Sequence, residues 1–93
     1  MTDAAEQAIR RGNRAEQILT DPLVVEAFTM LRAEYIRGIE SSKPDQPELR
    51  ERLYAHLTTL NSVAGHLRAV MEHGKLNKAQ VNELNGKKRF LVV

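Results

Sequence analysis

The stretch Pro47–Gly74, PELRERLYAHLTTLNSVAGHLRAVMEHG, decides the fold of this 93-residue chain. Apolar residues recur along it every three or four positions, which is the spacing of one face of an α-helix. The stripe consists of Leu49, Leu53, Leu57, Leu60, Ala64, Leu67 and Met71. Pro47 suits the first position of a helix, and Gly74 suits the left-handed residue after a last turn. The pattern therefore predicts one long helix over residues 47–73.

A second helix is predicted over residues 22–41. Asp21 is placed to cap its first turn, and Pro22 takes the first helical position. Its apolar stripe consists of Val24, Phe28, Leu31, Tyr35 and Ile39. Because the linker of residues 42–46 is short, we expect an antiparallel helical hairpin in which the two stripes face each other. The helix-packing core of this hairpin is predicted to include Phe28, Leu31, Tyr35, Leu53, Leu57, Leu60 and Leu67.

The two ends of the chain are predicted to add smaller elements. An N-terminal helix is expected over about residues 3–19, with small residues on one face that permit close approach to a neighbour. Gly12 leaves open whether this helix is continuous or broken, since glycine costs about 1 kcal/mol relative to alanine inside a helix. Asn77 is a typical capping residue and predicts a short helix over about residues 78–85.

The last seven residues, KKRFLVV, include an aromatic and two β-branched residues, and this content favours an extended tail over a helix. We therefore predict an all-α fold with one helical domain over residues 1–86 and a basic, apolar tail over residues 87–93. For this tail two interpretations stay open. It folds back onto the open end of the hairpin, or it binds a partner protein through Lys87, Lys88, Arg89, Phe90, Leu91 and Val92.

Composition excludes several classes of protein. The chain has no cysteine, which rules out disulfides, thiolate catalysis and cysteine-based metal sites. No run approaches the roughly 20 apolar residues of a membrane span, so we expect a soluble, cytoplasmic protein that makes no membrane contact. The net charge is +2, but the distribution is uneven: residues 1–74 carry −2 and residues 75–93 carry +4.

No pattern points to catalysis. His66 and His73 lie seven residues apart, about 10 Å along a helix, which is too far to share one metal ion. The acidic residues are spread over polar faces, several of them at helical spacing from a basic residue. We therefore expect no enzyme activity, no cofactor and no metal site.

Basic residues near both ends suggest a nucleic-acid contact as an alternative. The candidate residues are Arg10, Arg11, Arg14, Lys75 and Lys78. Glu6, Glu16 and Glu83 dilute these clusters, and the predicted helix over 78–85 offers only one lysine to a DNA groove.

Four segments carry a resemblance: LTDPLVVEAF, LRERLYAHL, HGKLNKAQVNEL and the terminal KKRF. Together they resemble small helical-hairpin proteins of unassigned function that are encoded near the head and packaging genes of tailed bacteriophages and prophages. The likeness covers most of residues 15–90 and identifies no functional residue. It implies a bacterial host cell, with association with the virion as an alternative, and a structural or assembly role.

The leading hypothesis is accordingly a non-enzymatic protein–protein interaction or assembly protein of a phage. It would form a homo-oligomer through its helix stripes and bind a partner, such as a phage structural protein, through its tail. A nucleic-acid-binding packaging or regulatory factor is the first alternative. A small inhibitor of a host enzyme is the second.

Overall fold

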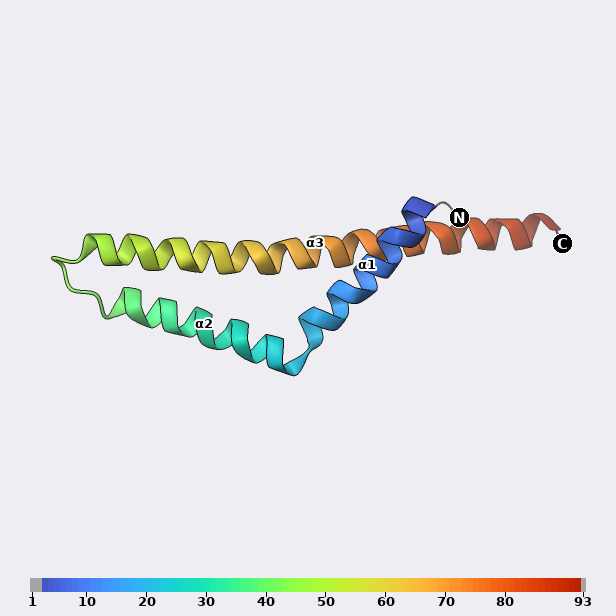
Figure 1. Ribbon diagram of the computed structural model, residues 1–93. Helices are drawn as coiled ribbons and strands as arrows, with labels where there is room; N and C mark the ends of the chain where they lie inside the picture. Colours follow the sequence, from blue (N-terminus) through green and yellow to red (C-terminus); the bar gives the residue numbers. More distant parts are fainter. Residues whose placement is uncertain (1–2, 93) are drawn as a thin grey trace. The chain divides into compact units, whose positions relative to one another are not determined.

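The computed structural model describes the backbone of residues 3–92 and the side-chain surroundings of residues 3–86. The fold is all-α, as predicted, with helices α1 (Asp3–Thr20), α2 (Pro22–Glu40) and α3 (Pro47–Val92) and no strand among the described residues (Figure 1). The helices form two compact units. We call Leu19–His66 the hairpin unit. The other unit consists of two segments, one up to Ile18 and one from Leu67 onward, and we call it the crossing unit.

The start of α2 follows the predicted capping pattern. The Asp21 carboxylate accepts hydrogen bonds from the backbone N–H groups of Leu23, at 2.9 Å, and of Val24, at 3.3 Å. Pro22 occupies the first turn, where its missing N–H group costs nothing. The boundary between α1 and α2 is therefore fixed by local chemistry.

In the hairpin unit, α2 lies beside the first part of α3, and the two helices run antiparallel (Figure 1). From the loop outward, the pairs in contact are Gly38 with Leu53, Tyr35 with His56 and Arg32 with Asn61. In these pairs the residue number decreases on α2 while it increases on α3, which is the order of an antiparallel pair. The predicted hairpin is confirmed.

The hairpin loop is tied together by one arginine of α3. Arg50 Nη1 donates hydrogen bonds to the carbonyl oxygen of Lys43, at 2.6 Å, and to the hydroxyl oxygen of Ser42, at 3.2 Å. The N–H of Lys43 in turn donates to the side-chain oxygen of Gln46, at 2.9 Å. These bonds satisfy loop groups that no helix partner reaches.

In the crossing unit, α1 packs on α3 where two glycines meet. Ala8, Gly12 and Ala15 of α1 are buried, and so is Gly74 of α3. A Cβ atom built on Gly12 would lie 2.7 Å from the Gly74 Cα, and one built on Gly74 would lie 2.8 Å from the Ala8 carbonyl oxygen. Only glycine allows the two backbones to come this close. The helix α1 also continues through Gly12, which settles the alternative of a broken helix.

The predicted end of the long helix at Gly74 is wrong. The helix α3 continues from Pro47 to Val92, and no described glycine has a positive φ angle. Gly74 serves close packing against α1 instead of capping a helix. Asn77 also does not cap, because its Nδ2 atom donates to the carbonyl oxygen of His73 one turn earlier, at 2.9 Å.

Because α3 continues past Gly74, two further predictions are also wrong. The separate short helix over 78–85 is part of α3, and the tail over 87–92 is helical rather than extended. Helix growth adds a hydrogen bond with each residue, so a single Asn85-Gly86 step does not force an end. Val93 and the side-chain surroundings of residues 87–93 lie outside the described part. The predicted division into a domain of residues 1–86 and a tail of 87–93 stays a prediction.

Candidate interaction surface

The apolar stripes of the hairpin unit face each other but are only partly covered. Six of the seven predicted packing residues are half-buried: Phe28, Tyr35, Leu53, Leu57, Leu60 and, in the crossing unit, Leu67. Leu31 is 38% exposed and so lies at the margin of the packed face. No residue of 19–66 is buried. The hairpin unit therefore has a contact line between two helices and lacks an enclosed core.

A second apolar strip on α2 points away from α3. Leu23 is 71% exposed and Met30 is 63% exposed, and Ala27 lies between them on the same helix face. Large apolar side chains at such exposure, aligned along one helix, are typical of a surface that another protein covers. We call the exposed set Leu23, Glu26, Ala27, Met30, Ala33, Glu34 and Arg37 the α2 outer face.

Charged side chains lie near the two ends of the α2 outer face, acidic Glu26 at one end and basic Arg37 at the other. Glu26 and Arg37 are eleven residues apart, about three helical turns, so they project from the same side of α2. Both residues are exposed, and neither side chain has an ion-pair or hydrogen-bond partner among residues 3–86. Glu34 is also exposed and lies on this face, four residues after Met30 and within one turn of Arg37.

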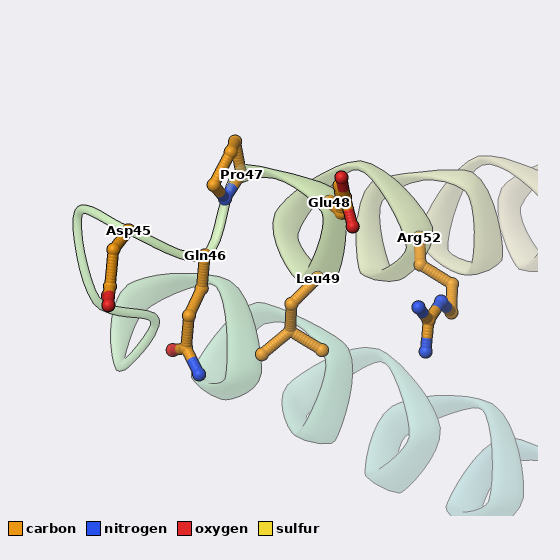
Figure 2. Close-up of a pocket in the computed structure, with 6 residues that line it drawn as sticks. All are labelled: Asp45, Gln46, Pro47, Glu48, Leu49 and Arg52. Carbon is orange, nitrogen blue, oxygen red and sulfur yellow. The ribbon is translucent and has the colours of Figure 1, made fainter.

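An open pocket of about 490 Å³ lies at the hairpin loop. It is lined by Asp45, Gln46, Pro47, Glu48, Leu49 and Arg52, which Figure 2 shows spread around the loop and the first turns of α3. All of these residues except the half-buried Leu49 are exposed.

The three histidines are surface residues, and one of them stacks on an aromatic ring. The ring of His56 stacks on that of Tyr35, with centroids 5.5 Å apart and an interplanar angle of 29°. His66 and His73 are exposed. Within the part of the chain that the structure describes, no three metal-ligating side chains gather in one place.

The predicted nucleic-acid residues all lie in the crossing unit, but most of them contact neighbours of their own. Arg10 pairs with Glu6 at 3.9 Å, and Lys75 pairs with Glu16 at 3.7 Å, which links α3 to α1. Arg14 donates to the side-chain oxygen of Gln17 at 3.4 Å.

The two remaining basic residues, Arg11 and Lys78, are exposed. The structure thus brings these five residues into one unit, while acidic and amide neighbours occupy three of them. Nucleic-acid binding stays a prediction.

The predicted partner-binding residues Lys87 to Val92 continue α3 as helix, and their side chains lie outside the described part. Two features were missed from sequence, one on the α2 outer face and one in the crossing unit. The charged ends of the α2 outer face could have been found from the eleven-residue spacing of Glu26 and Arg37. The role of Gly74 could not, since a capping glycine and a packing glycine have the same local sequence signal.

In comparisons with known proteins, no protein family, no curated protein and no solved structure matches this chain. Within its described residues, no helix combines the length and the apolar composition that crossing a membrane requires.

Proposed function

We propose that this chain is a non-enzymatic protein–protein interaction module, whose hairpin unit is completed by a partner protein that covers its exposed apolar surface. The observation that carries the proposal is the absence of any buried residue within 19–66. Burial of apolar area is the main term that offsets the entropy of ordering a chain. A hairpin without fully buried side chains gains little free energy from the burial of apolar area.

Other means of stabilising so small a unit are lacking. The chain has no cysteine for a disulfide, and the described residues hold no cluster that would bind a metal ion. Small domains without such cross-links commonly gain stability by association. The exposed strip of Leu23, Ala27 and Met30 supplies the apolar area that association would bury.

The phage or prophage setting of this proposal rests on the resemblance of LTDPLVVEAF, LRERLYAHL and HGKLNKAQVNEL to helical-hairpin proteins of phage head and packaging regions. In that setting the module would serve assembly. Its tail would be a second contact, presented on the end of α3 as a helix and not as an extended peptide.

Hydrogen exchange tests the need for a partner. We expect the amides of residues 19–66 in the purified chain, diluted until it is monomeric, to open with a free energy of at most about 2 kcal/mol, since local opening spans from zero to the global value. Exchange read by mass spectrometry of peptides gives this quantity. Opening energies of about 5 kcal/mol or more, typical of a self-sufficient domain, would contradict the proposal.

A further inference from the structure

Two oppositely charged side chains of the α2 outer face, Glu26 and Arg37, favour one kind of partner. Glu26 and Arg37 lie at equal distances on either side of the Leu31–Arg32 step, on one side of the helix. A two-fold axis that passes beside this step would bring residue 26 of one helix opposite residue 37 of the other. In such an isologous contact, each residue pair occurs twice.

We propose that a second copy of this chain docks on the α2 outer face with its α2 antiparallel, so that Glu26 of each copy meets Arg37 of the other. This proposal rests on the proposed function and identifies its partner.

Charge and size both fit this pairing. Opposite charges would meet at both ends of the contact, and neither side chain has to give up an existing partner. Between these ends, Met30 of one copy would lie near Ala33 of the other, which sets a large side chain against a small one. A parallel second helix would instead set Glu26 against Glu26 and Arg37 against Arg37.

The contact also gives each α2 two neighbours in place of one. Two hairpins joined through α2 make a four-helix arrangement, in which the α2 helices are the inner pair. Because one 19-residue helix forms the contact, the interface is at the small end of specific interfaces. We expect a dissociation constant on the order of micromolar.

Charge reversal with rescue tests the pairing, with sedimentation equilibrium as the measurement. We expect Glu26→Arg alone and Arg37→Glu alone each to raise the dissociation constant of the dimer at least about tenfold, because each sets like charges opposite each other twice. The double variant Glu26→Arg with Arg37→Glu should restore the constant to within about threefold of the original chain. Glu51→Arg, an exposed charge reversal on α3 away from this face, is the matched control and should leave the constant unchanged.

A second variant probes the centre of the contact. Met30→Lys would place two ammonium groups beside the two-fold axis, and we expect it to leave the chain monomeric at all concentrations up to about 100 times the original dissociation constant. Helical circular dichroism should persist in this variant, because the Met30 side chain is 63% exposed.

If Glu26→Arg, Arg37→Glu and Met30→Lys all leave the dissociation constant unchanged, the assignment of the α2 outer face is overturned. An original chain that stays monomeric at millimolar concentration would overturn the second copy as partner. The proposed function fails separately, through protected amides in residues 19–66 of the monomer.

Discussion

Replacing Gly74 by alanine should destabilise this protein, although the same replacement stabilises most helices. Alanine is favoured over glycine by about 1 kcal/mol inside a helix, so the intrinsic effect is stabilising. At Gly74, however, the new methyl group would lie 2.7 Å from the Gly12 Cα and 2.8 Å from the Ala8 carbonyl oxygen. Backbone atoms of a helix cannot move aside as a side chain can, so α1 has to shift as a whole. We expect a net loss of about 1–3 kcal/mol in the free energy of unfolding.

Gly65 provides the matched control on the same helix. A Cβ atom built there meets no atom within 4 Å, so Gly65→Ala should stabilise the protein by up to about 1 kcal/mol. Urea unfolding followed by circular dichroism measures both variants. Opposite signs for Gly74→Ala and Gly65→Ala are the expected result. Equal stabilisation by both would show that the crossing of α1 and α3 does not exist in solution.

Replacing Leu76 by proline should cost about 3 kcal/mol or more, because Leu76 lies inside the continuous helix α3. Proline would remove the hydrogen bond from its own N–H to the Glu72 carbonyl, and its ring would collide with that same carbonyl. The break would fall next to Lys75, which pairs with Glu16 of α1. We therefore expect a loss of helical signal at 222 nm together with a lower urea midpoint.

Leu76→Ala separates the backbone effect from the side chain. Leu76 is 57% exposed, so its truncation alone should change the free energy of unfolding by only a few tenths of a kcal/mol. If residues 75–77 formed a loop before a separate short helix, proline would be tolerated there. Equal stabilities of Leu76→Pro and Leu76→Ala would support that loop and contradict the continuous helix.

The parts of the fold that could be read from sequence are those that local chemistry decides. Asp21 and Pro22 specify a helix start through hydrogen bonds and a fixed φ angle, whatever surrounds them. The leucine stripe of residues 49–71 specifies a face, and the short linker specifies an antiparallel neighbour. These inferences were correct because they depend on a few adjacent residues.

The parts that could not be read depend on contacts between distant residues. Gly74 has the sequence signature of a helix end, and only the presence of Gly12 against it reveals a packing role. Asn77 likewise has two hydrogen-bonding modes, a cap and a bond back to the turn before, and the continuing helix selects the second. The prediction of an extended tail rests on β-propensity, which is a weaker guide than helix continuation from an already formed α3.

The candidate surface also combines features that local sequence decides with features that depend on distant contacts. Leu23, Ala27 and Met30 can be recognised as apolar from the sequence, whereas their exposure depends on where α3 lies beside α2. The two-fold arrangement of Glu26 and Arg37 has meaning only once both are known to be exposed and unpaired among the described residues.

If a second copy of the chain completes the hairpin unit, Tm depends on protein concentration, and thermal unfolding at several concentrations tests this most directly. For a dimer that unfolds to two separate chains, a hundredfold rise in concentration adds about 2.7 kcal/mol to stability, which raises Tm by about 7 °C for 186 residues in total. We predict a shift of this size between about 5 µM and 500 µM, followed by circular dichroism. A Tm that is the same at both concentrations would contradict the claim.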